Sequence, residues 1–170
     1  MMPKNLFFIF VFLCMTVQSC TVSFINAGID YSVLKTFSLR QFDVKAENAP
    51  PNSGKTFSEL LKDKIINNTR LAYQNEEGDL DFNGYLSAYT IKALAPQPDQ
   101  TVAFQRLTIN IQVVFKNNKI KDGSKDWSQK FSRFANFSSE EDLASVEEAL
   151  IQDIYDQILN DVFNQAFSGW

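Results

Sequence analysis

The sequence predicts an α+β fold, a two-layer sandwich in which two helices pack on one face of a four-stranded mixed or antiparallel sheet. Three observations predict it: four segments alternate apolar and polar residues, two segments have the helical spacing of apolar residues, and the order is β-α-β-β-β-α. Apolar residues make up 45% of the 170 residues, which is enough to build the core of one domain. Since no repeat or long linker interrupts this pattern, residues 33–170 are expected to form a single domain.

The first strand is expected at residues 33–42, where apolar side chains share one side. Residues 47–54 contain two prolines and a glycine and therefore predict a loop. The string Thr56-Phe57-Ser58-Glu59 has the spacing of a capping box, in which the Thr56 side chain caps a helix and Glu59 reaches back. A helix is expected from there to about Asn68, because apolar residues recur every three or four positions.

Two further strands are expected at residues 80–91 and 107–116. The segment 80–91 alternates, and Gly84 on its apolar side indicates close approach by another part of the chain. The segment 107–116 alternates most regularly, with apolar residues on one side against threonine, asparagine, glutamine and lysine on the other. One face of the sheet is therefore expected to be buried and the other to be exposed to water.

The last strand, at residues 127–137, is expected to pair with the preceding one across a lysine-rich turn at residues 117–126. Its aromatic residues do not keep strict alternation, so a bulge between Phe131 and Phe134 is predicted. Ser138-Ser139-Glu140-Glu141 is then expected to cap a final helix. This helix is expected to be about 25 residues and about 37 Å long. Its apolar stripe is broad enough to cover most of the sheet.

The N-terminal residues predict an exported lipoprotein. Lys4 is followed by about ten apolar residues, a pattern typical of a secretory signal and too short to span a bilayer as a helix. Val17-Gln18-Ser19-Cys20 resembles a bacterial lipobox, with cleavage after Ser19 and lipid attachment to the thiol of Cys20. Cys20 has no disulfide partner in the mature chain, which fits acylation.

Residues 1–19 are therefore expected to be a lipoprotein signal peptide, with Val17 at position −3 and Ser19 at position −1 of the cleavage point. Residues 20–32 are expected to form a lipidated tether that holds the domain to a membrane through its acyl chains. Two alternatives stay open, a secreted protein with a free thiol at Cys20 and a retained N-terminal anchor.

The composition argues against catalysis and against nucleic-acid binding. The sequence has no histidine and one mature cysteine, which excludes Cys–His catalysis and the common zinc sites. No metal site, cofactor or catalytic residue is expected. Acidic pairs such as Glu147-Glu148 are typical of solvated surface, although a hydrolase that uses two carboxylates stays an alternative. The net charge of −4, without a dense basic stripe, predicts no nucleic-acid partner.

Several strings of residues, in their order and spacing, resemble the LptE family of lipopolysaccharide-assembly lipoproteins, in the form found in Bacteroidota-like bacteria. They are Gly78-Asp79-Leu80-Asp81-Phe82-Asn83-Gly84, Arg106-Leu107-Thr108-Ile109, Phe131-Ser132-Arg133-Phe134-Ala135 and the run from Leu143 to Trp170. The resemblance implies an outer-membrane lipoprotein that is not an enzyme. In a host of the Bacteroidota type, the lack of an acidic residue directly after Cys20 favours a lipid-anchored position that faces the periplasm. The resemblance also implies a partner, the LptD β-barrel, in which such proteins sit as a plug and help to pass lipopolysaccharide to the outer leaflet.

Lipopolysaccharide carries phosphates, so contact with it calls for exposed cations. The candidates for contact with lipopolysaccharide or the partner are Lys119, Lys121 and Lys125 in the turn, and Arg106 and Arg133 near strand ends. The alternatives are ordinary turn solubility for the lysines, and salt bridging or sheet-edge packing for the arginines. The alternative function is a periplasmic lipoprotein that serves another envelope complex as a binding or scaffold module.

Overall fold

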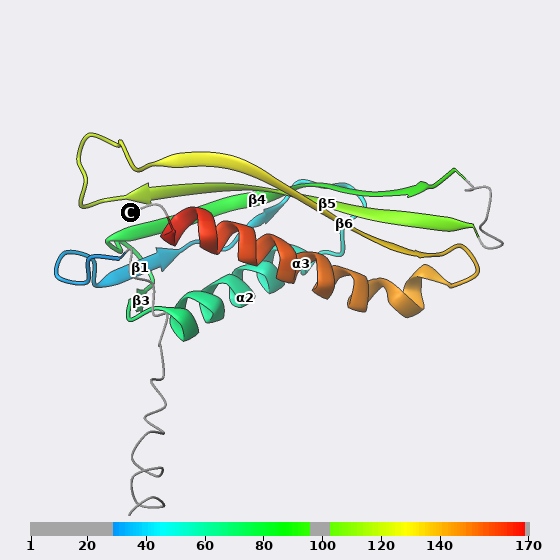
Figure 1. The fold of residues 1–170 in the computed structure, drawn as a ribbon, viewed down its shortest axis with the longest axis horizontal. Helices are drawn as coiled ribbons and strands as arrows, with labels where there is room; N and C mark the ends of the chain where they lie inside the picture. The colour runs from blue at the N-terminus through cyan, green and yellow to red at the C-terminus, as the bar shows by residue number, and fades with distance from the viewer. Residues whose placement is uncertain (1–28, 96–102, 169–170) are drawn as a thin grey trace, which may run out of the picture.

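The computed structural model describes residues 29–95 and 103–168. It has two layers, a sheet and two helices that both lie on one of its faces (Figure 1). Three expectations fall outside the described residues: the signal peptide at 1–19, lipid attachment at Cys20 with Val17 and Ser19 before it, and most of the tether at 20–32. The expectations for these residues therefore stay predictions.

The sheet has six strands, where four were expected, and the elements follow the order β-β-α-β-β-β-β-α. The strands are Thr36–Leu39 (β1), Asp43–Val44 (β2), Ala72–Gln74 (β3), Leu80–Ala93 (β4), Phe104–Asn117 (β5) and Trp127–Ser138 (β6). They lie in the order β3-β1-β4-β5-β6, and β2 pairs with β4 beyond the end of β1. The pairs among β4, β5 and β6 are antiparallel, and the pairs that involve β1, β2 and β3 are parallel, so the sheet is mixed.

The two additional strands have local causes. The strand expected at 33–42 is divided because the chain leaves the sheet between β1 and β2. There Phe42 turns into the core, and its N–H donates to the hydroxyl of Ser58 at 2.9 Å. β3 consists of three exposed residues, so it has no buried side that would produce an alternating pattern in the sequence.

The first helix, α2, spans Ser53–Asn68 and begins before the expected capping box. The N–H of Thr56 donates to the carbonyl of Asn52 at 2.9 Å, so Thr56 lies inside the first turn and the expectation that it caps the helix is wrong. The early start brings Gly54 against the carbonyl of Phe42, where a side chain would collide with it. The start of α2 is thus fixed by contact with the segment between β1 and β2.

The second helix, α3, spans Leu143–Phe167 and has the expected 25 residues. Its cap is Asp142, whose carboxylate accepts from the N–H of Ala144 at 3.4 Å. The expected cap at Ser138 is wrong, because Ser138 is the last residue of β6. The strand continues to this point because β5 offers a pairing partner as far as Phe104.

The bulge expected in β6 lies instead in β4. β5 and β6 pair without interruption, whereas the register of β4 shifts between Leu86 and Ala88. The shift brings Tyr89, 4% exposed, onto the core side in place of Ala88. Phe134 needs no bulge because it stays on the exposed side of the sheet, where it is 47% exposed.

The core lies between the helices and one face of the sheet. β5 contributes its odd-numbered residues Leu107, Ile109, Ile111, Val113 and Phe115, all of them buried. The close approach expected at Gly84 is confirmed, because a Cβ atom there would lie 2.6 Å from the ring of Phe42. The helices leave the opposite face of the sheet uncovered, as the alternation predicted (Figure 1).

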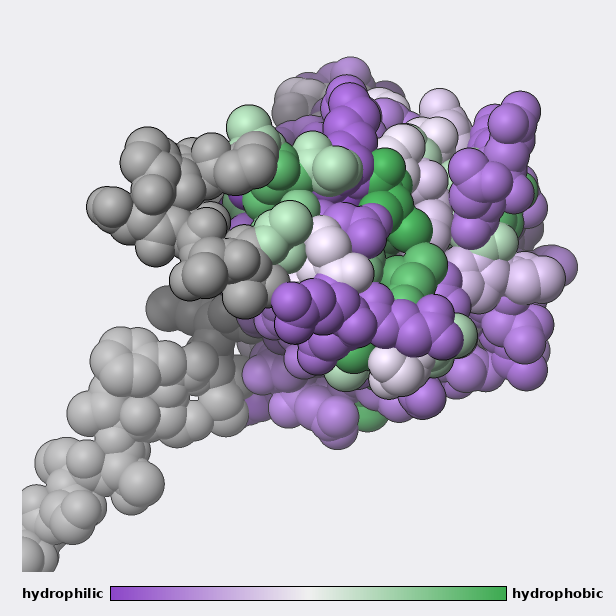
Figure 2. Space-filling model, turned by 90° about the vertical axis from the view of Figure 1, so that its right-hand side faces the viewer, coloured by the Kyte–Doolittle hydropathy of each residue, from purple (hydrophilic) through white to green (hydrophobic). Residues whose placement is uncertain are grey.

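The three long strands extend beyond the helices at one end of the molecule, where β4 ends and β5 begins (Figure 1). Figure 2 looks at this end and shows mostly hydrophilic residues, with hydrophobic residues visible between them. Ile91, near the end of β4, is 37% exposed although it pairs with the buried Leu107. Hydrophobic side chains become exposed here because the strands extend past the ends of the helices that cover the rest of the sheet.

Candidate functional site

The candidate site is the face of the sheet that no helix covers, which we call the open sheet face. It is made by the even-numbered residues of β5 and β6 and by their partners in β4, together with residues next to β1 and β2. Thr108, Asn110 and Gln112 form its centre, and no residue of this face in β5 is fully buried. The face therefore presents hydrogen-bonding groups to its surroundings.

The open sheet face and α3, which lie on opposite sides of the sheet, differ in the sign of their charge. Among the residues that the structure describes, the open sheet face has six basic side chains, Arg40, Lys45, Lys92, Arg106, Lys116 and Lys130. Its four acidic side chains are Asp43, Asp81 and, in the loop beside Arg40 at one end, Glu76 and Glu77. α3, on the other side of the sheet, has five acidic residues and no basic one. The open sheet face is thus basic although the whole chain has a net charge of −4.

Arg106 is held flat on the open sheet face. Its guanidinium lies 3.8 Å from the centre of the Phe134 ring, and its Nε donates to Oδ1 of Asn136 at 2.9 Å. Lys92 pairs with Arg106 across the strands, which brings a second basic residue beside it. No carboxylate pairs with either residue in 29–95 and 103–168, so the pair favours an anion from outside the domain.

Lys119 serves a different purpose from the one expected of it. Its Nζ lies 2.8 Å from Oδ1 of Asp79, and Oδ2 of Asp79 accepts from the backbone N–H groups of Lys35 and Thr36 at 2.7 and 3.0 Å. Burial alone raises the pKa of Asp79. The hydrogen bonds from Lys119, Lys35 and Thr36 outweigh that effect and lower the pKa to about 2. Lys119 is therefore part of a structural clasp between the start of β1 and the turn after β5.

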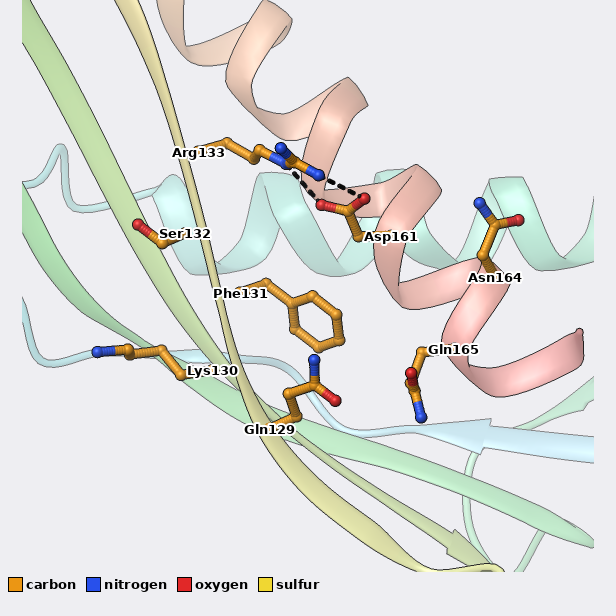
Figure 3. Close-up of a pocket in the computed structure, with 8 residues that line it drawn as sticks. All are labelled: Gln129, Lys130, Phe131, Ser132, Arg133, Asp161, Asn164 and Gln165. Atoms are coloured by element: carbon orange, nitrogen blue, oxygen red, sulfur yellow. Dashed lines mark hydrogen bonds and ion pairs between the residues drawn. The ribbon is translucent and has the colours of Figure 1, made fainter. Parts of the chain in front are cut away.

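Arg133 is likewise engaged by a carboxylate. It lies on the helix side of β6, and its Nε and a terminal nitrogen are 2.6 and 2.8 Å from the two carboxylate oxygens of Asp161 on α3 (Figure 3). This two-point contact raises the pKa of Arg133. Of the roles considered for Arg133, contact with a ligand, a salt bridge within the domain or packing at the sheet edge, the structure shows the salt bridge.

The five expected contact residues do not form one site. Lys119, Lys121 and Lys125 lie in the turn between β5 and β6, and all three are exposed. The length of β5 separates this turn from Arg106 by about 35 Å. Arg133 lies on the other side of the sheet, against α3. Of the five, only Arg106 belongs to the open sheet face.

Five of the six basic residues of this face, Arg40, Lys45, Lys92, Lys116 and Lys130, were not expected to contact a ligand, although the alternation placed Lys116 on the polar side. Lys116 could have been named as a candidate from the sequence, because its place on the polar side of 107–116 is visible there. Lys92 and Lys130 need the pairing register, which sets them opposite Arg106 and Gln112. Lys45 lies 3.8 Å from the centre of the Tyr85 ring, a contact that no sequence pattern indicates.

An open groove of about 570 Å³ lies on the helix side, between β6 and the C-terminal half of α3 (Figure 3). Its lining is mainly polar, with Gln129 and Arg133 from β6 and Asp161, Asn164 and Gln165 from α3. Within the described ranges, no three histidine, cysteine, aspartate or glutamate residues are placed to hold a metal ion. A helix long and apolar enough to cross a bilayer is not found in the same ranges.

The fold and the open sheet face are those of a binding protein: a compact α+β domain that can contact a partner through a broad, polar surface. The family model of LptE, described as lipopolysaccharide-assembly, matches residues 34–166. The chain belongs to this family of lipopolysaccharide-assembly lipoproteins, which confirms the resemblance found in the sequence.

Curated proteins include no match to this chain. Among solved structures, uncharacterized lipoprotein B from Nitrosomonas europaea has a TM-score of 0.52 at 13% identity, over 80% of this chain and 84% of that one. A minor lipoprotein from Acinetobacter baumannii has a TM-score of 0.46 at 15% identity, over 80% and 94%. Rare lipoprotein B from Shewanella oneidensis has a TM-score of 0.47 at 10% identity, over 79% and 92%. The first of these likenesses supports a shared fold.

Proposed function

We propose that this chain is an outer-membrane lipoprotein, anchored through acyl chains on Cys20 and facing the periplasm. In this proposal its domain is the plug and assembly partner of an LptD-like β-barrel, and it takes part in moving lipopolysaccharide to the cell surface without catalysing a reaction. The family match over residues 34–166 is the observation that carries the proposal.

The shape and polarity of the domain support a place inside a barrel. The lumen of a large outer-membrane barrel is polar and filled with water, so a domain inside it meets polar groups on all sides. The open sheet face supplies such groups from Thr108, Asn110 and Gln112. A domain that turned a hydrophobic sheet face outward would not suit this environment.

The pair formed by Arg106 and Lys92 is the proposed contact for a phosphate group of lipopolysaccharide. Phe134 and Asn136 fix the direction of the Arg106 side chain, which reduces the entropy that Arg106 loses when it binds an anion. Lys119 and Arg133 are already bound to Asp79 and Asp161, so they suit a structural role. Lys121 and Lys125 stay candidates for contact with the partner at the other end of the sheet.

The proposal is tested by purifying the native lipoprotein from outer membranes in mild detergent and identifying the proteins that accompany it. We expect a large β-barrel protein in near-equal amount, and labelling of the lipoprotein by palmitate unless Cys20 is replaced by serine. Two results together refute the function: no barrel protein accompanies the purified lipoprotein, and cells depleted of this chain export lipopolysaccharide normally.

The phosphate contact needs its own variant. Arg106→Gln should weaken the binding of purified lipopolysaccharide to the detergent-solubilised protein about tenfold, since a charge-assisted hydrogen bond contributes about 1.5–3 kcal/mol. Lys55→Ala, an exposed change on α2, is the matched control and should bind normally. Equal binding by both variants would leave the open sheet face without this role.

A further inference from the structure

The outer edge of β6 has backbone groups that no other strand uses. The N–H of Ser139 donates to the carbonyl of Ala103 at 2.9 Å, which fixes which residues of β6 face β5. In an antiparallel pair these residues alternate with residues whose N–H and C=O groups point away. The outward residues are Ser128, Lys130, Ser132, Phe134 and Asn136. None of their N–H groups has a hydrogen-bond partner in the described part of the chain.

The edge is also open to an approaching strand. The same five residues are exposed, and β6 contains no proline and no bulge, two devices by which edge strands usually block further pairing. Only its last residue is covered, since the N–H of Ser138 donates to the carboxylate of Glu141 at 3.1 Å. The groove of about 570 Å³ beside α3 leaves room for side chains on the helix side of an added strand. Figure 3 shows Lys130 and Ser132 pointing away from α3, onto the open sheet face.

The basic residues near the edge of β6 favour an acidic strand as its binding partner. β5 and β6 together contain Arg106, Lys116, Lys130 and Arg133, and neither strand contains an acidic residue. A second copy of this chain, paired edge to edge, would set one basic sheet beside another, which is unfavourable. A strand with carboxylates on alternate residues would set them next to Lys130 and toward Arg106.

We propose that the free edge of β6 receives an extended segment of another protein, which carries acidic residues at alternate positions and adds a strand to the sheet. Resting on the proposed function, this segment belongs to the barrel partner. Backbone hydrogen bonds to the outward groups supply the affinity, and the basic residues of the open sheet face select the acidic side chains.

The experiment compares Ser132→Pro with Ser132→Ala in the full-length lipoprotein, purified from outer membranes in mild detergent. Proline removes an N–H that points away from β5, so the native pairing stays, while an incoming strand loses a donor and meets the ring. We expect about tenfold less barrel protein with Ser132→Pro, and the wild-type amount with Ser132→Ala. Lys130→Glu keeps every backbone group and should lower the amount severalfold, so it decides the question if the proline variant does not fold.

Capture of the barrel at the wild-type level by folded Ser132→Pro or by Lys130→Glu overturns the inference and leaves the proposed function standing. If the wild-type protein captures no barrel, the proposed function fails. A photoreactive amino acid at position 128 then tests separately whether another chain binds at the edge of β6. An adduct with an acidic extended segment of another protein supports the inference, and an adduct between two copies of this chain, or none, overturns it.

Discussion

Replacing Asp79 by asparagine tests whether one carboxylate holds the N-terminal edge of the sheet. Asp79 precedes β4, and its oxygens accept from the backbone of Lys35 and Thr36 and from the side chain of Lys119. It thus joins the start of β1, the start of β4 and the turn after β5. Asparagine has nearly the same shape, but it has no negative charge and one carbonyl oxygen in place of two acceptors.

The size of the effect follows from the pKa of Asp79, which falls from 3.8 to about 2 in the folded protein. This difference corresponds to about 2–3 kcal/mol of the free energy of unfolding, at 1.36 kcal/mol per pH unit. The side chain of Lys119 is 46% exposed, so screening by solvent lowers this value toward the lower end of the range. Because the pKa is lowered, the stabilisation is present above about pH 4 and is lost as the pH falls to 2.

Urea unfolding followed by tryptophan fluorescence measures the effect. Asp79→Asn should lower the free energy of unfolding by about 2 kcal/mol at pH 7, and the difference from the wild type should shrink toward zero near pH 2. Lys119→Ala should cost less, because the backbone N–H groups of Lys35 and Thr36 still bind the carboxylate. Asp63→Asn, on the exposed side of α2, should cost little at any pH. A difference between wild type and Asp79→Asn that stays constant from pH 7 to pH 2 would refute this reasoning.

Three further changes test the core and the contact between the layers. Gly84→Ala should lower the free energy of unfolding by at least about 1–3 kcal/mol in urea, because its methyl group collides with the backbone carbonyl of Gln112 on β5 and with the ring of Phe42; an unchanged midpoint would contradict these contacts. Tyr155→Phe should cost about 1–2 kcal/mol, since it removes the hydrogen bond to the carbonyl of Ser53. Burial raises the pKa of Tyr155 to about 12, so the wild type should lose more stability than this variant as the pH rises from about 10 to 12, which unfolding in alkaline buffers measures. Arg133→Gln should cost at most about 1 kcal/mol in thermal unfolding, because Arg133 and Asp161 are 46% and 30% exposed and water screens the pair.

The elements that are best predicted from the sequence are those in which the pattern of apolar and polar residues matches the sides that are buried and exposed in the fold. β5 lies in the middle of the sheet with one face against the helices, so its alternation of apolar and polar residues is complete. α3 is predicted as well, because a long helix on a sheet needs a continuous apolar stripe. The start of α2 is not predictable in this way. It depends on contact between Gly54 and the carbonyl of Phe42, two residues that only the fold brings together.

The position of the bulge also could not be predicted from the local pattern of residues. A bulge was expected in β6 because it would bring Phe134 to the core side, and this expectation assumed that every aromatic residue is buried. Phe134 instead remains exposed beneath the guanidinium of Arg106. The true irregularity, between Leu86 and Ala88, leaves a regular alternation on both sides and is visible only when β4 is aligned with β5.

The candidate site was predictable only in outline, because it depends on pairing. A polar sheet face follows from the alternation in 107–116, yet which basic residues share that face depends on the register that sets Lys92 opposite Arg106. Net charge was a poor guide, since the acidic residues of α3 cancel the basic residues of the sheet in the sum but not in space. A charge on one layer acts mainly on partners within about 8 Å at physiological salt, so a ligand at the open sheet face is attracted by the local basic residues.

This separation of charge also constrains how the domain can sit in a polar enclosure. A partner surface that contacts both the open sheet face and α3 has to be acidic opposite the first and basic opposite the second, because a surface of one sign would be repelled by one of the two. The orientation of the domain is therefore specified by charge before any close contact forms. Exchanging the sign of either layer should disturb the placement of the domain more than its folding, since most of these side chains are exposed and take no part in the core.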